Sequence, residues 1–188
     1  GRWISIGYPW DLLRANDEII WKYTENINKW AIIEPNVTIK WNIYLEEWVI
    51  LKSGTYIEWN VYFGKWAIIW PNAYIRGNTS IGENSKIGAF VELKNSYIGE
   101  STCIPHLSYF WDSIIGNNSN MGGWTKVANL RHDGTNIRVM IKNKLVDSGR
   151  RKLGAIAWDN VHTGIGTLIY PGRILSTDST TLPGEIVK

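Results

Sequence analysis

The sequence predicts an all-β fold, a left-handed parallel β-helix of hexapeptide repeats, with a short N-terminal helix and an inserted loop. Two series of residues with a period of six carry this prediction. The first series is large and apolar: Ile33, Ile39, Leu45, Leu51, Ile57, Phe63, Ile69, Ile75, Ile81, Ile87 and Leu93. The second series, four residues later, is small or β-branched: Val37, Ile43, Val49, Thr55, Val61, Ala67, Ala73, Thr79, Ser85 and Val91.

A period of six fits neither a helix, which repeats every 3.6 residues, nor an isolated strand, which alternates every two. It fits a chain that makes a short strand, turns a corner and repeats. Three hexads then make one triangular coil of 18 residues, and each strand stacks in parallel on its equivalent one coil later. The pattern continues to Val127 with one-residue slips after Leu93 and after Phe110.

The segments beside the hexads differ from them. An amphipathic helix is expected within residues 10–28, because Pro9 precedes a mixed apolar and charged run that starts at Asp11. Residues 128–152 break the repeat and are expected to leave the β-helix as a loop. We therefore expect a linker helix at 1–28, a β-helix domain at 29–175 and an irregular tail at 176–188.

Bulk composition excludes several classes of protein. The net charge of +3 is too small to indicate nucleic-acid or membrane binding. No apolar run approaches the roughly 20 residues of a membrane helix, and the N-terminus has no signal-peptide pattern. The single cysteine, Cys103, excludes an intrachain disulfide and is expected to be a small core or corner residue. We expect a cytoplasmic protein.

Two cations lie one coil apart. Arg76 and Lys94 are separated by 18 residues, which stacks them on one face at roughly 5 Å. They would repel each other unless an anion such as a sugar phosphate sat between them, and arginine suits bidentate contact with phosphate. The alternative is a pair of solvated surface charges.

The three histidines do not form a zinc motif. His106, His132 and His162 are separated by 26 and 30 residues, whereas zinc sites usually hold two ligands a few residues apart. We therefore predict that the chain uses no metal.

Several short motifs resemble the acyltransferase domain of bifunctional sugar-1-phosphate nucleotidylyltransferase/acetyltransferases, especially the archaeal ones. They include His-Leu-Ser-Tyr at 106–109, and they occupy residues 81–88, 90–94, 106–109, 120–122, 128–131 and 149–154. The resemblance covers about residues 30–175. Residues 7–13 look like the end of the nucleotidylyltransferase domain, whose glycine-rich nucleotide loop is absent, which implies a remnant of that domain.

The resemblance implies acetyl transfer from acetyl-CoA to the amine of glucosamine 1-phosphate or galactosamine 1-phosphate, for UDP-N-acetylhexosamine synthesis, in a homotrimer. It places the general base at His106, and a neutral imidazole suits that role near pH 7. A surface histidine without a role is the alternative. The resemblance also assigns Arg76 and Lys94 to the phosphate.

Further site residues follow from the same resemblance. Tyr109 and Asn120 match ligands of the sugar hydroxyls, and Asn129 matches a residue beside the acetyl group. Asn120 equally suits a β-helix corner, because asparagine tolerates positive φ. The candidates for binding CoA are Gly123, Arg138, Arg150, Arg151 and Lys152. The cations among them are equally consistent with plain loop charges.

Tryptophan is unusually frequent, with 12 residues. Nine stand where the repeat favours glycine or a similar residue: Trp30, Trp41, Trp48, Trp59, Trp66, Trp70, Trp111, Trp124 and Trp158. In other hexads the place of Trp48 and Trp66 holds Asn or Gly, which indicates a left-handed backbone: Asn36, Asn42, Gly54, Asn60, Asn72, Asn78 and Asn84. That backbone costs tryptophan about 1–3 kcal/mol. The alternatives are an altered sequence, corners that tolerate tryptophan, or an engineered, catalytically impaired β-helix scaffold. Trp111 and Trp124 are expected near the acetyl-CoA cleft.

Overall fold

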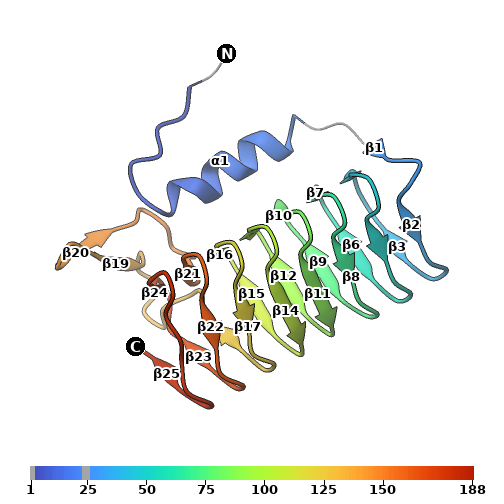
Figure 1. The fold of residues 1–188 in the computed structure, drawn as a ribbon. Helices are drawn as coiled ribbons and strands as arrows, with labels where there is room; N and C mark the ends of the chain where they lie inside the picture. The colour runs from blue at the N-terminus through green and yellow to red at the C-terminus, as the bar shows by residue number, and fades with distance from the viewer. Residues whose placement is uncertain (1–2, 23–25) are drawn as a thin grey trace.

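The computed structural model describes residues 3–22 and 26–188, and it shows a left-handed parallel β-helix whose three sheets form a prism (Figure 1). Face A contains β1 (Asn26–Ile27), β4 (Ile43–Leu45), β7 (Val61–Phe63), β10 (Thr79–Ile81), β13 (Tyr97–Ile98), β16 (Ile114–Ile115), β21 (Ile156–Ala157) and β24 (Ile174–Leu175). Face B contains β2 (Ile32–Ile33), β5 (Ile50–Leu51), β8 (Ile68–Ile69), β11 (Lys86–Ala89), β14 (Cys103–His106), β17 (Asn120–Met121) and β22 (His162–Thr163). Face C contains β3 (Thr38–Ile39), β6 (Tyr56–Glu58), β9 (Tyr74–Arg76), β12 (Glu92–Lys94), β15 (Tyr109–Trp111), β18 (Lys126–Val127), β23 (Leu168–Ile169) and β25 (Ile186–Val187).

The strand register confirms the coil length that the hexads predict. Ile57 pairs with Ile75 one coil of 18 residues later. After Leu93 the coils shorten by one residue, so that Leu93 pairs with Phe110. The predicted slips are therefore real and shorten a corner without breaking the parallel ladder.

From Leu45 onward, the large apolar residue of each hexad fills the inside of the prism, whereas Ile33 on the first coil is exposed. Leu51, Ile57, Phe63 and Ile87 are completely buried. The small residues of the second series, such as Thr55, are buried as well, because they line the tight corners. Each coil therefore buries its apolar face only by stacking on its neighbours.

The corners hold left-handed residues in columns, as predicted for Asn36, Gly54 and Asn72. One column differs from the prediction. Asn60 and Asn78 are not left-handed, and the preceding residues Trp59 (φ 75°) and Gly77 (φ 67°) take that conformation. These corners turn one residue earlier than their hexad position suggests.

Four of the nine unusual tryptophans have positive φ. Trp48 (φ 62°) and Trp66 (φ 59°) confirm the predicted left-handed corners, and Trp59 and Trp124 (φ 66°) share the conformation. Stacking of the indole of Trp48 on that of Trp30, with ring centroids 5.1 Å apart, offsets part of the backbone strain. The remaining corner tryptophans have ordinary backbone and carry no such strain.

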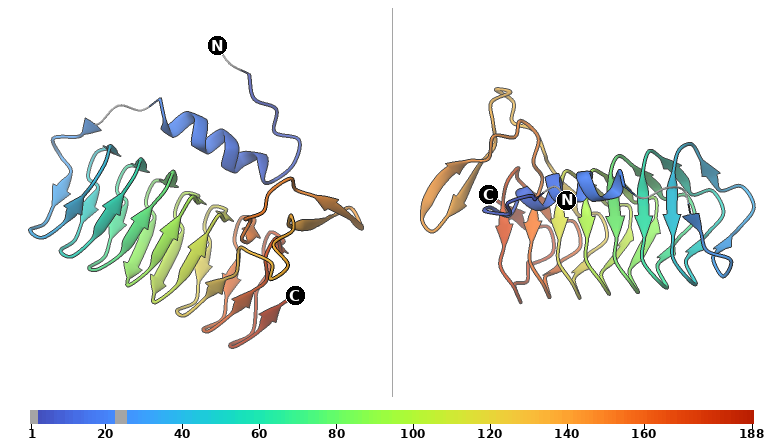
Figure 2. Two further views of the ribbon diagram at one scale, coloured as in Figure 1. Left: turned by 180° about the vertical axis from the view of Figure 1, so that it is seen from behind. Right: turned by 90° about the horizontal axis from the view of Figure 1, so that it is seen from above.

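Helix α1 (Asp11–Ile20) lies along face A, beside β10 and β13 (Figure 2). Its residue Leu13 and the preceding Trp10 pack in one apolar cluster with Ile114 of face A and with Val139 and Leu153 of the inserted loop. The helix therefore ties that loop to the prism. No helix within residues 3–22 and 26–188 is long and apolar enough to cross a membrane.

The inserted loop contains a two-stranded antiparallel hairpin, β19 (Arg138–Ile141) and β20 (Lys144–Asp147), which projects from one end of the prism (Figure 2). Beyond the loop the coils resume, so that Ile115 pairs with Ala157. The prediction of an irregular tail from residue 176 was wrong at its end. There β25 pairs with β23, because its apolar residues repeat the hexad pattern once more.

Gly88 lies where two successive coils approach each other closely. A Cβ atom at this position would lie 1.3 Å from the carbonyl oxygen of Pro105 on the next coil. We expect Gly88→Ala to lower the free energy of unfolding by about 3 kcal/mol, because the backbone cannot move without breaking the ladder. Gly184→Ala is the control, since its φ is +71° but no atom of the described residues lies within 4 Å of the added Cβ, and it should lose only about 1 kcal/mol. Equal losses in denaturant unfolding of the two variants would contradict this explanation.

Candidate functional site

The outward side of face C carries a row of polar and aromatic side chains. Successive coils place Glu58, Arg76, Lys94 and Trp111 in direct register. They point outward because each is the third residue of a strand whose second residue, such as Ile75 or Leu93, is buried. The predicted stacking of Arg76 on Lys94 is therefore confirmed.

Arg76 has an acidic and an aromatic neighbour on the same face. Its Nη2 atom lies 3.3 Å from Oε1 of Glu92. Its guanidinium carbon lies 5.3 Å from the ring centroid of Tyr74, whose hydroxyl donates a 2.6 Å hydrogen bond to Glu58. The repulsion between the two stacked cations is therefore partly offset by Glu92.

Trp111 covers both cations. Its ring centroid lies 4.4 Å from the guanidinium carbon of Arg76 and 4.7 Å from Nζ of Lys94, within the range of cation–π attraction. The Nε atom of Arg76 and the Nε1 atom of Trp111 are buried, and neither has a hydrogen-bond partner in the described part of the chain. Buried donors without an acceptor are rare in native proteins, so this cluster lacks an acceptor.

Burial and charge shift the pKa values of three groups on this face. Burial lowers the pKa of the Lys94 ammonium below its usual range, although the nearby Asp112 carboxylate opposes the shift. Burial, together with acidic neighbours, raises the pKa of Tyr74 and of Tyr109 to about 12. Both phenols are therefore neutral hydrogen-bond donors at physiological pH.

The predicted base lies around a corner from this row. His106 ends β14 on face B and is exposed, and its ring makes an edge contact of 5.6 Å with Trp70. A Cβ atom on Gly123 would lie 3.7 Å from Cβ of His106, which places Gly123 beside the histidine. Asn120 is also on face B and exposed. One chain thus brings His106 and Gly123 together but holds Asn120 on a different face from Arg76 and Lys94.

Asn129 is positioned by residues that the repeat pattern did not single out. It is 8% exposed, and its Nδ2 atom donates a 2.6 Å hydrogen bond to Oδ2 of Asp112. Asp112, Glu92 and Tyr74 were not predicted as site residues. Glu92 and Tyr74 are marked only by an outward strand position, and Asp112 is a buried corner residue directly after β15. Tyr109 was predicted and lies on face C, with its ring 4.9 Å from that of Trp111.

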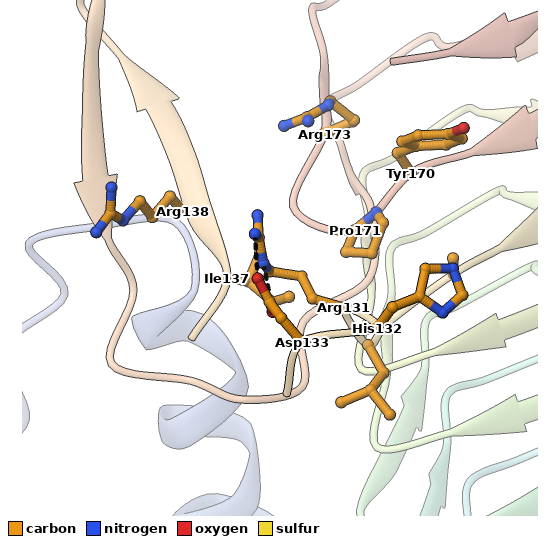
Figure 3. A pocket seen from close by; sticks show the side chains of 10 residues that line it. Arg131, His132, Asp133, Ile137, Arg138, Tyr170, Pro171 and Arg173 are labelled. Carbon is orange, nitrogen blue, oxygen red and sulfur yellow. Dashed lines mark hydrogen bonds and ion pairs between the residues drawn. The ribbon is translucent and has the colours of Figure 1, made fainter. Parts of the chain in front are cut away.

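The inserted loop and the last coils enclose a cavity of about 470 Å³. Arg138, Arg131 and Arg173 line it together with Tyr170 and Pro171, and the side chains of Figure 3 lie around it. Arg131 is paired with Asp133 at 2.6 Å. Arg138 was predicted as a CoA ligand, whereas Arg131 and Arg173 were not, because no common sequence motif relates these loop residues to a residue of the last coils.

The other predicted cations do not line this cavity. Arg150, Arg151 and Lys152 follow the hairpin, where the Arg150 Nε atom donates to the carbonyl oxygen of Lys152 at 3.4 Å. In the described ranges, 3–22 and 26–188, no three His, Cys, Asp or Glu side chains are grouped closely enough to hold a metal ion.

Comparison with known proteins identifies related chains. The family model of the GMPPB C-terminal domain matches residues 57–176. A bifunctional sugar-1-phosphate nucleotidylyltransferase/acetyltransferase of Sulfurisphaera tokodaii is 43% identical over 100% of this chain and 46% of its own length. The bifunctional protein GlmU is 50% identical in Methanococcus maripaludis, over 95% of this chain and 43% of its own. In Methanocaldococcus jannaschii it is 49% identical, over 92% of this chain and 41% of its own length. The chain thus spans less than half the length of these relatives.

Tyr74 and Tyr109 of face C should titrate at high pH. In the folded chain the pKa of both phenols is raised from 10.0 to about 12, so folding favours their neutral forms. This contribution to the free energy of unfolding is complete below pH 10. This contribution is lost as pH rises toward 12. We expect the tyrosinate absorbance of the chain to show a late step that Tyr74→Phe and Tyr109→Phe each reduce. If either substitution instead reduced a step near pH 10, that result would contradict the raised pKa of the tyrosine that was replaced.

Proposed function

We propose that this chain, which belongs to the family of the GMPPB C-terminal domain, transfers an acetyl group from acetyl-CoA to the amine of an amino-sugar 1-phosphate. The acceptor is glucosamine 1-phosphate or galactosamine 1-phosphate, and the product serves UDP-N-acetylhexosamine synthesis. The observation that carries the proposal is the register of Arg76 on Lys94, two outward cations on adjacent coils. The acetyltransferase named among the relatives supports the reaction type.

A phosphate supplies what the cluster lacks. Arg76 has a buried Nε–H group for which residues 3–22 and 26–188 offer no acceptor, and the Lys94 ammonium is partly desolvated. A phosphate dianion accepts from both, and charge-assisted hydrogen bonds of this kind are about twice as strong as neutral ones. Tyr109 on the same face is placed to donate to a sugar hydroxyl.

The chemistry requires one base. The amine nitrogen attacks the thioester carbonyl carbon and loses a proton to the imidazole of His106. The tetrahedral intermediate then collapses, the C–S bond breaks, and the imidazolium returns its proton to the CoA thiolate. Asn129 lies beside the acetyl group in this scheme, and Asn120 binds a second sugar hydroxyl.

The division of the site between two faces supports a trimer. His106 and Asn120 lie on face B, whereas Arg76 and Lys94 lie on face C. Side-by-side packing of prisms about a threefold axis brings face B of one copy against face C of the next. We therefore propose a homotrimer whose sites lie between copies.

Acetyl-CoA is the co-substrate, and the cavity under the inserted loop fits its phosphates. Arg138 and Arg173 both line that cavity, and the Nε atom of Arg173 is buried with no hydrogen-bond partner among the described residues. Gly123 leaves the surface beside His106 open for the thioester. Arg150, Arg151 and Lys152 add positive charge along the same loop.

An engineered, catalytically impaired scaffold was the alternative. The comparisons give it no support, since the relatives are natural proteins related along nearly the whole chain. One of the unusual tryptophans still affects the site, because Trp111 in β15 lies over both cations.

The test is turnover of acetyl-CoA by the purified chain, followed by thiol release, with three acceptors. We expect turnover with glucosamine 1-phosphate or galactosamine 1-phosphate and little with glucosamine, which lacks the phosphate. Equal turnover with glucosamine would contradict the role of Arg76 and Lys94. Absence of turnover with every acceptor would contradict the proposed reaction.

His106→Ala should remove the base. We expect kcat to fall about 100-fold or more, because general base catalysis typically contributes 10²–10⁴. The oligomer mass and the thermal midpoint should not change, since His106 is exposed. His162→Ala is the matched control, an exposed histidine on face B two coils further on, and it should keep full activity. Full activity of His106→Ala would overturn the assignment.

Trp111→Gly should uncover the cations. We expect KM for the amino-sugar phosphate to fall about tenfold, because the phosphate no longer displaces two cation–π contacts worth roughly 0.5–1 kcal/mol each. Trp158→Gly, at the same place in another hexad, is the control and should leave KM unchanged. An increase of KM in Trp111→Gly would show that the indole is a ligand of the substrate instead.

A further inference from the structure

Asp112 is a buried acid beside the proposed site. It follows β15 directly, is 3% exposed and has φ 49°. The corner alone does not require a carboxylate, because Asn95 takes the same conformation one coil earlier. A buried charge is unfavourable unless it is hydrogen-bonded, so the carboxylate needs another explanation.

The carboxylate binds two amides. Its Oδ2 atom accepts from Nδ2 of Asn129 at 2.6 Å, and its Oδ1 atom accepts from Nδ2 of Asn95 at 3.2 Å. The backbone of Asp112 is held equally well. Its N–H group donates to the Lys94 carbonyl at 2.8 Å, and its carbonyl accepts from Gly154 N–H at 2.8 Å.

The Asn129 amide lies where the inserted loop leaves and rejoins the prism. The carbonyl of Asn129 accepts from Leu153 N–H at 3.0 Å, so both ends of the loop meet at this residue. Asp112 therefore joins three parts of the proposed site: Lys94, Asn129 and the loop that carries Arg138.

An ionised carboxylate can only accept hydrogen bonds. It therefore fixes which way round the Asn129 amide lies, with the NH₂ group toward Asp112 and the carbonyl oxygen away from it. An asparagine at position 112 could both donate and accept, and it would allow either orientation of Asn129.

We propose that Asp112 is a positioning residue, which orients the Asn129 amide so that its carbonyl oxygen accepts a hydrogen bond from the reacting amine of the amino sugar. The inference rests on the proposed function. An amide oxygen that accepts from the amine N–H group directs the nitrogen lone pair toward the thioester. The inverted amide would instead present an N–H donor to an N–H donor, and the amine would turn away.

Two variants of Asp112 distinguish an effect on the orientation of the Asn129 amide from an effect on the stability of the fold. Asp112→Asn keeps the shape of the corner, and Asp112→Gly keeps its left-handed backbone, because both residues tolerate positive φ. Asp178 provides the matched control. It is also a left-handed corner residue, with φ 62°, and it accepts from Nδ2 of Asn160 at 2.9 Å, on coils beyond the inserted loop.

The first measurement is kcat and KM of the full chain with acetyl-CoA and glucosamine 1-phosphate. We expect Asp112→Asn to lower kcat at least twofold, because the Asn129 amide then takes either orientation, with KM for both substrates nearly unchanged. Asp178→Asn should have no effect. A purely structural role for Asp112 would instead lower the thermal midpoint and leave kcat per folded protein unchanged, which would overturn the proposal.

The second measurement does not depend on activity. In a chain labelled with ¹⁵N-asparagine, the Asn129 side-chain amide, identified by its loss in Asn129→Ala, should exchange slowly with solvent. Asp112→Gly should make that exchange at least tenfold faster. Fast exchange in the unaltered chain would overturn the Asp112–Asn129 tether. Slow exchange in a chain without turnover would count against the proposed function alone.

Discussion

The structure depends on the parallel hydrogen-bond ladder between successive coils. Strands in parallel sheets stack at about 4.7–4.9 Å, so every side chain on one coil has a fixed neighbour on the next. This constraint explains Gly88, where a single methyl group would meet the carbonyl of Pro105. It also makes the outward faces into rows of side chains, and the candidate site is one such row.

The ladder gives the site its electrostatic character. Arg76 and Lys94 are held in register whether or not their charges favour it. The energy of that repulsion is offset by Glu92, by the indole of Trp111 and, in the proposed function, by a phosphate. Asp112 adds a negative charge at the corner, where the same ladder brings it beside the Lys94 carbonyl. The fold thus fixes the geometry of the row, and in the proposed function the phosphate of the substrate is the missing acceptor.

The period of six determined the prism, its register and its shortened coils from the sequence alone, because each hexad contributes one buried residue such as Ile57 or Phe110. The stacking of Arg76 on Lys94 followed from the same arithmetic. The corner at Trp59 and Gly77 was misplaced by one residue, since Asn60 and Asn78 looked like the obvious left-handed residues. The tail was misjudged because Ser and Thr dominate its composition and hide the final apolar pair at Ile186 and Val187.

Other parts of the site could not be predicted from the sequence. The contact of Asp112 with Asn129 joins a corner to an inserted loop, and no periodicity relates the two. The cavity lined by Arg131, Arg138 and Arg173 likewise forms only where the loop folds back on the last coils. The roles of His106 and Asn120 came from a motif resemblance, and a single chain does not bring them to the face of Lys94.

The most direct test of the proposed site is a crystal structure of the chain with glucosamine 1-phosphate and CoA. We expect the phosphate on Arg76 and Lys94, with the indole of Trp111 displaced and the amine facing His106 of a neighbouring copy. A sugar phosphate bound away from the Arg76–Lys94 row, or bound with its amine remote from every His106, would contradict it.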